Sequence, residues 1–131
     1  MIVSTRGRYA LRIMAELAGS DGFRSLKLLA ERQSIPHKYA ESIMTALVKA
    51  ELAEGSRGKN GGYKLSRPPE KYTLAEILKV TETSLSSASC SGGTDGCPRS
   101  ADCPAYPVWK ALDETVYQFL SQYTLLDLLK S

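Results

Sequence analysis

Two short helices with a sharp break between them, followed at once by a glycine-rich hairpin, restrict the fold of this chain more than any other feature. Ser25 is a good N-cap for a helix predicted over 26–33, and the pair Ser34-Ile35 interrupts it. Pro36 then stands in the first turn of a third helix that continues to about residue 50, a position where proline is tolerated. Helix, short break and helix form the helix-turn-helix pattern.

The hairpin that follows has a basic and flexible tip. Segments 52–54 and 63–65 are predicted as short strands, and the glycine-rich stretch between them carries Arg57 and Lys59. Such a hairpin directly after a helix-turn-helix is a wing, whose cations meet DNA phosphates or enter a minor groove. A nucleotide-phosphate loop is disfavoured, because the stretch has neither Walker spacing nor a following helix.

The third helix has a polar face that suits a DNA groove. At helical period its polar side chains gather on one side, and apolar side chains such as Met44 and Leu47 lie opposite. Hydroxyl groups on that face can reach phosphates or bases, and a carboxylate can accept a hydrogen bond from cytosine N4. An ordinary amphipathic surface helix has the same pattern. It is therefore the wing after this helix that favours DNA as the partner of the polar face. The predicted DNA-binding residues are Lys38, Glu41, Ser42, Thr45, Arg57 and Lys59.

Charge and hydropathy restrict the classes of protein to which the chain can belong. Residues 1–66 hold 11 Lys or Arg against 6 Asp or Glu, whereas residues 67–131 hold 6 against 8. A basic first half fits a polyanionic partner, and an ordinary solvated surface is the alternative. No run approaches the ~18 apolar residues that span a bilayer. The start lacks the hydrophobic core of a signal peptide, so we expect a cytoplasmic protein without membrane contact.

The remaining segments complete a mainly α fold. A first helix capped by Ser4 or Thr5 ends at Gly19, and Thr73 caps a short helix to about residue 80. A long helix follows Pro104 to about residue 123, before a last turn over 125–129. The predicted organisation is a winged helix-turn-helix domain over 1–66, a short helix and linker over 67–89, a cysteine loop over 90–103, and a dimerisation helix with a C-terminal turn over 104–131.

The long helix carries a bulky apolar stripe. Six side chains fall within about 100° of arc at helical period: Trp109, Leu112, Val116, Phe119, Leu120 and Tyr123. A stripe of this size is too large for the free surface of a monomer. It either packs back on its own domain or forms the seam of a homodimer, and the homodimer is the favoured interpretation.

All the cysteines lie in one stretch, as Cys90, Cys97 and Cys103, with six and five residues between them. Glycines and Pro98 between them disfavour a helix or strand. The odd number and the reducing cytoplasm argue against a disulfide framework. The thiols are therefore a ligand set or a redox device.

Thiolates are the usual ligands of iron–sulfur clusters, whereas structural zinc sites pair cysteines two to four residues apart. The wider spacing is loose for zinc but can wrap around a cluster. A thiol redox switch or a zinc site without a cluster is the alternative. An enzyme with a reactive cysteine is disfavoured, because the single histidine, His37, lies in the DNA-binding module rather than among the thiols. A protein that acts only as an adaptor between other proteins would require that the basic face binds no partner.

Four motifs give the chain a resemblance to a known family. STRGRYA over 4–10, IPHKY over 35–39, RGKNGGY over 57–63 and the cysteine triplet resemble, in this order, bacterial winged-helix transcription regulators typified by IscR and NsrR. The resemblance covers essentially the whole chain and implies a homodimeric regulator, often one that senses iron, nitric oxide or oxidants through an iron–sulfur cluster. It places Lys38 and Glu41 toward DNA bases, Arg57 near the minor groove, and Cys90, Cys97 and Cys103 at the cluster.

The resemblance also implies a twofold dimer, and it leaves the fourth cluster ligand open. A dimer would present two recognition helices about one DNA turn apart, roughly 34 Å, which predicts a pseudo-palindromic operator. Tyr106 stands where the [2Fe–2S] member carries a histidine, and Arg8 stands where some [4Fe–4S] members use an acidic residue of the partner's first helix. Asp95, Asp102, the tyrosinate of Tyr106 or a small exogenous ligand could complete the set. A [4Fe–4S] cluster is favoured over [2Fe–2S].

Overall fold

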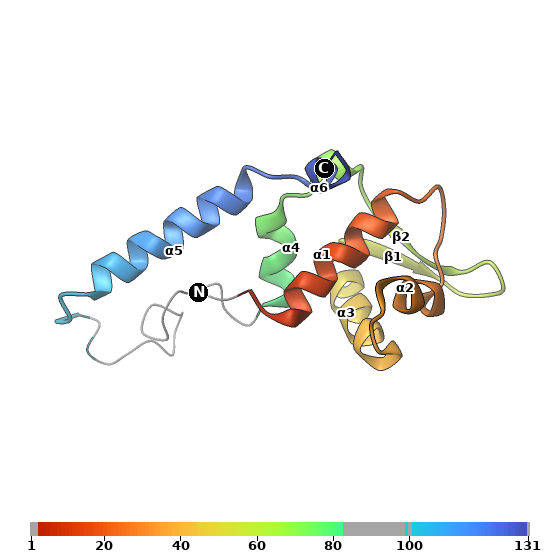
Figure 1. Cartoon of the computed structure of the whole chain (residues 1–131), viewed down its shortest axis with the longest axis horizontal. Helices are drawn as coiled ribbons and strands as arrows, with labels where there is room; N and C mark the ends of the chain where they lie inside the picture. The colour runs from red at the N-terminus through yellow and green to blue at the C-terminus, as the bar shows by residue number, and fades with distance from the viewer. Residues whose placement is uncertain (1–2, 83–98, 100, 131) are drawn as a thin grey trace.

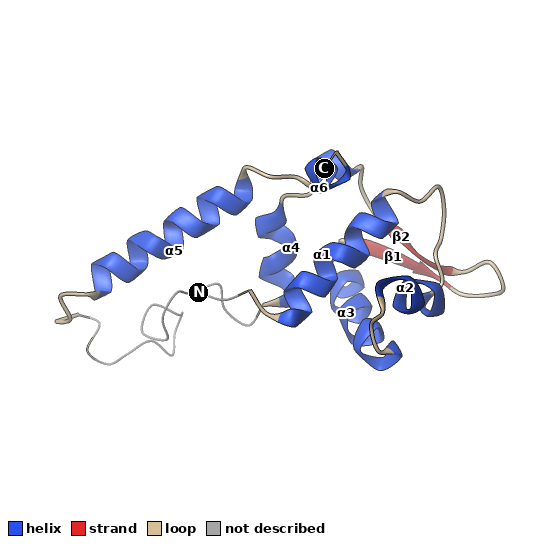
Figure 2. Ribbon diagram, viewed as in Figure 1, coloured by secondary structure: helices blue, strands red, loops and turns tan. Residues whose placement is uncertain are grey.

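Helices dominate the computed structural model, which describes residues 3–82, 99 and 101–130 (Figures 1 and 2). Within these ranges the elements are α1 Thr5–Ala18, α2 Leu26–Gln33, α3 His37–Lys49, β1 Ala53–Ser56, β2 Gly62–Leu65, the 3-10 helix η1 Pro69–Lys71, α4 Leu74–Thr81, α5 Tyr106–Ser121 and α6 Leu125–Leu129. The prediction of a mainly α winged helix-turn-helix with a two-stranded wing is confirmed. Of the helices in this part of the chain, none combines the length and the apolar character that a membrane span needs.

Local capping chemistry explains where the helices begin. The hydroxyls of Ser4, Ser25 and Thr73 accept hydrogen bonds from backbone N–H groups in the first turns of α1, α2 and α4. Ser34 takes a left-handed conformation, with φ 55° and ψ 46°, and turns the chain from α2 toward α3. Pro36 is the N-cap of α3 rather than a residue of its first turn, so α3 begins at His37.

The core lies where α1, α2 and α3 meet. Ile13 and Met14 of α1, Leu29 of α2 and Met44 of α3 are fully buried. The apolar side predicted for the third helix is therefore confirmed as its packing face. The same core takes Tyr72, Ile77 and Leu125 from the chain after the wing.

The wing is an antiparallel hairpin that a third segment extends. Ala53 pairs with Leu65 at its base, and the backbones of Arg24 and Tyr63 exchange two hydrogen bonds of 2.8 Å. Gly62 has φ 139°, and a side chain there would collide with the carbonyl of Arg24, so this position requires glycine. β1 begins after Leu52, one residue later than predicted, because the N–H of Leu52 closes the end of α3 by donating to the Leu47 carbonyl at 2.9 Å.

Tyr72 ties the wing to the helices that follow it. Its hydroxyl donates to the Leu52 carbonyl at 2.7 Å and accepts from the N–H groups of Ser66 and Arg67 at 3.0 Å. The guanidinium of Arg67 stacks over the Tyr72 ring and bonds Glu76 at 2.8 Å. The hydrogen bond with Glu76 raises the pKa of Arg67 above its usual value, so this cation stays charged throughout the accessible pH range.

α5 differs from every other helix in its surroundings. It extends away from the helix-turn-helix and wing (Figure 1) and has no buried residue. Its end is anchored, because Leu74 N–H donates to the Tyr123 carbonyl and Leu125 N–H donates to the Tyr72 carbonyl, both at 3.0 Å. Thr124 and Asp127 then form a capping box for α6, as the sequence pattern of a capped last turn predicts.

Candidate nucleic-acid interface

The predicted recognition face of α3 is one side of a surface groove. The groove has a volume of about 490 Å³ and is lined by Arg6, Lys38, Glu41, Ser42, Thr45, Ala46 and Lys49. The four α3 residues expected to face DNA thus come together in one exposed depression. Its charged groups are three cations and one carboxylate, so the groove favours a polyanion over a cation.

Hydrogen bonds inside the groove already orient its hydroxyls. Arg6 reaches across from α1, and its Nη1 donates to the Ser42 hydroxyl at 2.8 Å, while its Nη2 donates to the Ser42 carbonyl at 3.3 Å. The Thr45 hydroxyl donates to the Glu41 carbonyl at 2.9 Å. Ser42 keeps its own O–H as a donor for a phosphate or a base. Arg6 is the groove residue that the helical period of α3 could not reveal.

A second contact also joins α1 to α3. The rings of Tyr9 and Tyr39 meet edge to face, with centroids 5.7 Å apart. The guanidinium of Arg12 lies over the Tyr9 ring at 5.5 Å and donates to the Gln33 carbonyl at 2.6 Å. α1 therefore acts as the support on which the two helices of the helix-turn-helix are set.

The wing presents its cations to solvent. Arg57 and Lys59 are both exposed in the loop that joins β1 to β2. Arg57 also lines a hollow between the wing, the start of α2 and Val48 of α3. Arg57 and Val48, in the last turn of α3, thus line the same hollow.

The cysteine site lies only partly within the described residues. Cys90, Cys97 and the candidate ligand Asp95 fall outside them. Cys103 is half-buried in the turn before α5; its N–H donates to the Arg99 carbonyl at 2.8 Å, and its carbonyl accepts from Tyr106 N–H at 3.2 Å. Among residues 3–82, 99 and 101–130, no three histidine, cysteine or acidic side chains form a group that could hold a metal ion.

The candidate residues for the fourth cluster position differ in their exposure and in their hydrogen-bond partners. Asp102 is exposed and Tyr106 is half-buried, both next to Cys103 at the start of α5. The Arg8 guanidinium donates to the Thr5 hydroxyl at 3.1 Å on α1. His37 is exposed at the first residue of α3, within the predicted DNA-binding module.

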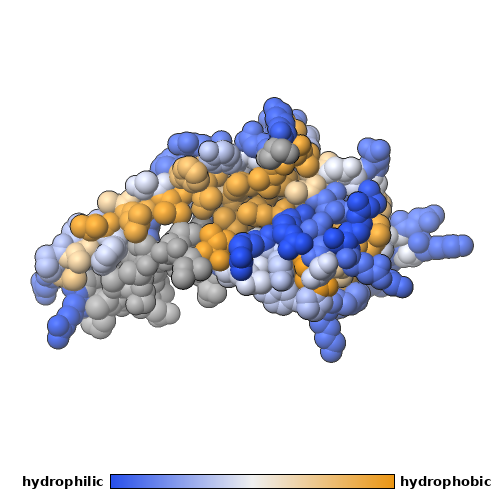
Figure 3. Space-filling view, viewed as in Figure 1, coloured by the Kyte–Doolittle hydropathy of each residue, from blue (hydrophilic) through white to orange (hydrophobic). Residues whose placement is uncertain are grey.

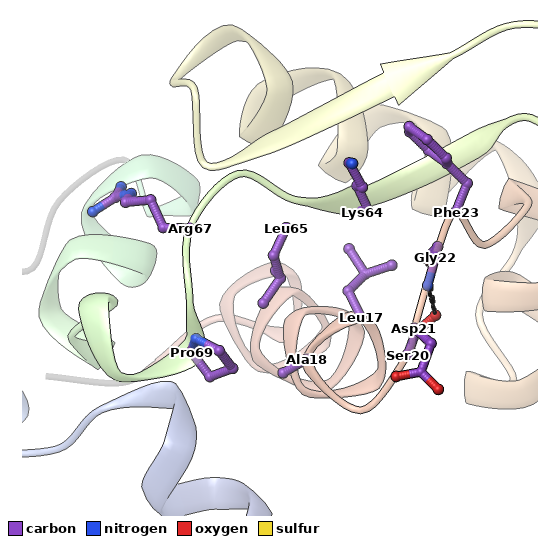
Figure 4. A pocket seen from close by; sticks show the side chains of 10 residues that line it. All are labelled: Leu17, Ala18, Ser20, Asp21, Gly22, Phe23, Lys64, Leu65, Arg67 and Pro69. Atoms are coloured by element: carbon purple, nitrogen blue, oxygen red, sulfur yellow. Dashed lines mark hydrogen bonds between the residues drawn. The ribbon is translucent and has the colours of Figure 1, made fainter.

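A smaller cavity lies between the end of α1 and β2 (Figure 4). Its volume is about 290 Å³, and its lining residues come from α1, the following loop, β2 and the segment before η1. Lys64 and Phe23 form a cation–π pair at its edge, 4.9 Å apart. Asp21 is the single carboxylate of its lining, and the lining holds no histidine or cysteine, so the cavity lacks the constellation of a catalytic site.

The apolar stripe of the long helix is partly exposed. Leu112, Phe119 and Tyr123 expose between 40% and 54% of their surfaces, whereas Trp109, Val116 and Leu120 are half-buried. In the face that Figure 3 shows, hydrophobic residues run along α5 toward the centre of the molecule. Within the described residues, about half of the stripe is therefore left exposed.

Comparisons with known proteins agree with this geometry. The Rrf2 family, described as iron-dependent transcriptional regulators, matches residues 3–131. The transcriptional regulator IscR of Cereibacter sphaeroides is 35% identical, over 100% of this chain and 88% of that protein.

Two solved structures share the fold over nearly the whole chain. T. potens IscR is 32% identical, with a TM-score of 0.79, over 99% of this chain and 87% of that one. CymR, the global cysteine regulator of B. subtilis, is also 32% identical, with a TM-score of 0.76, over 98% of this chain and 95% of that one. With its winged helix-turn-helix and cationic groove, the chain belongs to the Rrf2 family of transcriptional regulators and is not an enzyme.

Proposed function

We propose that the protein is a homodimeric regulator that reads a pseudo-palindromic operator with α3 and the wing, and that an iron–sulfur cluster held by Cys90, Cys97 and Cys103 controls this binding. The observation that carries the DNA-binding part is the groove along α3, in which predicted recognition residues and three cations converge. Selection from a random pool of duplexes tests it. We expect enrichment of two inverted half-sites about 10 base pairs apart, centre to centre. Failure to enrich any sequence would contradict the proposal.

Glu41 is proposed to choose a base, because it is the carboxylate among the cations of the groove. An acidic side chain accepts from cytosine N4, whereas a glutamine pairs with the N6 and N7 atoms of adenine. We expect Glu41→Gln to change the preferred base at one position of each half-site from cytosine toward adenine. One good base contact discriminates by about 1–3 kcal/mol. Binding titrations with the four operator variants measure the change, and an unaltered preference would remove Glu41 from base recognition.

Arg57 is proposed to supply a phosphate or minor-groove contact from the wing, because it is exposed beside the end of α3. We expect Arg57→Ala to weaken binding to all duplexes and to lower the slope of log affinity against log salt by about 0.9 for each phosphate that is no longer neutralised. Lys71→Ala is the control, since Lys71 is an exposed cation in η1. If affinity and salt slope match those of wild type, the wing assignment is wrong.

The homodimer is proposed to form through α5. The support is the exposed apolar stripe, together with the anchoring of the helix end through Tyr123 and Leu125. A helix that is fixed at one end and leaves part of its apolar stripe exposed can pack against the same helix of a second copy by twofold symmetry. Such a dimer would set the distance between two α3 helices, which is what a pseudo-palindromic operator requires.

The cluster proposal rests on the chemistry of the donors. Cys103 carries a free, half-buried thiol in a turn held by Arg99 and Tyr106, and thiolates are the ligands that iron–sulfur clusters use. IscR relatives support the same assignment. When bound, a cluster would supply iron that responds to oxidants, nitric oxide or iron supply. The chain's own residues would hold it from the segment that leads into α5, with [4Fe–4S] favoured.

A regulator that uses its thiols without a cluster is the second candidate. The likeness to CymR, described as a global cysteine regulator, means that the same fold occurs in a regulator whose description mentions no iron. A thiol switch or a zinc site would leave the anaerobically prepared protein without iron and sulfide. The two candidates therefore differ in metal content and share the proposal for α3, the wing and α5.

A further inference from the structure

We propose that Glu82 is a positioning residue for the DNA-reading groove. Its carboxylate holds the first turn of α1, and α1 in turn holds Ser42 of α3 through Arg6. This inference rests on the proposed role of the groove in DNA binding. It adds to that role a residue at the C-terminal end of α4, outside the helix-turn-helix and the wing.

The first link joins two segments that are 78 positions apart. One oxygen of Glu82, Oε1, accepts hydrogen bonds from both the backbone N–H and the hydroxyl of Ser4, each at 2.9 Å. The same Ser4 hydroxyl accepts from Gly7 N–H at 3.0 Å and so caps α1. A carboxylate is favoured there, because the start of a helix carries a partial positive charge. The cap of α1 and the end of α4 are therefore a single hydrogen-bonded unit.

Gly7 gives independent evidence that this carboxylate belongs to the packing. Gly7 is buried in the first turns of α1. A Cβ atom at this position would collide with Oε1 of Glu82 and would lie 3.0 Å from a methyl group of Leu78. A side chain at position 7 would therefore displace the Glu82 carboxylate from the start of α1.

The second link runs from the held turn to the recognition helix. Arg6 is two residues after the cap Ser4, in the turn that Glu82 fixes. Its guanidinium makes two hydrogen bonds to Ser42, one to the hydroxyl and one to the carbonyl. A planar guanidinium fork needs its backbone in a defined place to make both bonds, so a shift of the α1 start would release Ser42.

Glu82 acts on DNA binding indirectly. Its side chain is part-buried and engaged with Ser4, and a carboxylate is repelled by phosphates rather than attracted to them. It is also the last described residue before the segment that carries Cys90 and Cys97. The hydrogen bonds between Glu82 and Ser4 are therefore next in sequence to the segment that carries two of the proposed sensor cysteines.

The first test replaces the acceptor in the full-length protein. We expect Glu82→Ala to lower affinity for the selected operator by about five- to tenfold, within the range known for residues that modulate a site without touching its ligand. Affinity for an unselected duplex should stay within about twofold, because the phosphate contacts remain. Glu70→Ala, an exposed acid in η1, is the matched control and should change neither affinity. Thermal unfolding establishes that each variant is folded at the assay temperature.

Two further sets of variants test whether Glu82 acts through α1 and Arg6. If Glu82 acts through α1 and Arg6, then Glu82→Ala should cause no additional loss in an Arg6→Ala background. Ser4→Asp keeps an N-cap acceptor but sets two carboxylates together, so it should weaken operator binding. Adding Glu82→Gln to Ser4→Asp provides an amide donor and should restore affinity to within about twofold of wild type.

The outcomes separate this inference from the proposed function. A wild-type protein that selects no operator overturns the proposed function itself. A wild-type protein that selects one, with Glu82→Ala binding it equally well, overturns only the positioning role. The positioning role is also overturned if Glu82→Ala lowers affinity for operator and unselected DNA equally, because Glu82 would then not act on base reading. It is overturned as well if the losses from Glu82→Ala and Arg6→Ala are additive, because Glu82 would then not act through Arg6.

Discussion

The Phe119→Asp variant is expected to be a monomer in solution and to bind the operator about 10² to 10³ times more weakly than the wild-type protein. Phe119 belongs to the apolar stripe, lies in the last turn of α5 and exposes 54% of its surface. Its ring is 5.2 Å from that of Tyr123, so the two form a continuous aromatic patch. In a twofold dimer this patch would meet its own copy, and the substitution would appear twice at one seam.

Two physical effects make this change large. Fully burying a phenylalanine side chain stabilises an assembly by about 1.5–3 kcal/mol, and the variant forfeits that contribution in both subunits. Each introduced carboxylate must also give up its hydration without gaining a partner, which destabilises the dimer more than the missing ring does. A monomer then presents one α3 and one wing, and the second half-site no longer benefits from being tethered to the first.

Sedimentation analysis and operator titration measure the two consequences together. Gln118→Asp is the control, because Gln118 is exposed on the opposite side of α5, where it bonds Glu114 at 2.8 Å, and it adds the same charge. This control should stay dimeric with unchanged affinity. A Phe119→Asp protein that remains a dimer would show that α5 is not the seam.

Local sequence chemistry predicted most of the fold. Ser25 and Thr73 act as the caps that their residue types predict, and the 3.6-residue period separated the buried Met44 from the exposed Glu41 correctly. The length of the wing strands was less predictable, because it depends on which residue closes α3. Leu52 does so through a backbone bond that no side-chain pattern encodes.

The candidate site was predictable only where it is built from one helix. Helical period alone is enough to place Lys38, Glu41, Ser42 and Thr45 on one face, and the groove brings them together. Arg6 and Glu82 could not be found in this way, since their roles come from the packing of α1 on α3 and of α4 on α1. Sequence position does not reveal such contacts between separate helices.

The cysteine variants carry the second large expected effect. Cys90→Ser, Cys97→Ser and Cys103→Ser should each lose nearly all iron after anaerobic reconstitution, because a hydroxyl is a far weaker iron ligand than a thiolate. Visible absorption with iron and sulfide analysis measures the loss. Operator affinity of each variant should then be the same before and after reconstitution, whereas that of the wild type should change.

Tyr106→Phe is the comparison that makes the cysteine result specific. It keeps the ring and the backbone bond to the Cys103 carbonyl while removing a candidate oxygen ligand. Retained iron with an altered spectrum would support the tyrosinate as fourth ligand, and an unchanged spectrum would direct the search to Asp95, Asp102 or an exogenous ligand. A colourless wild-type protein without iron would overturn the cluster and leave the thiol switch or zinc site. Because Cys103 lies in the turn that starts α5, either chemistry there would act on the same proposed dimer helix.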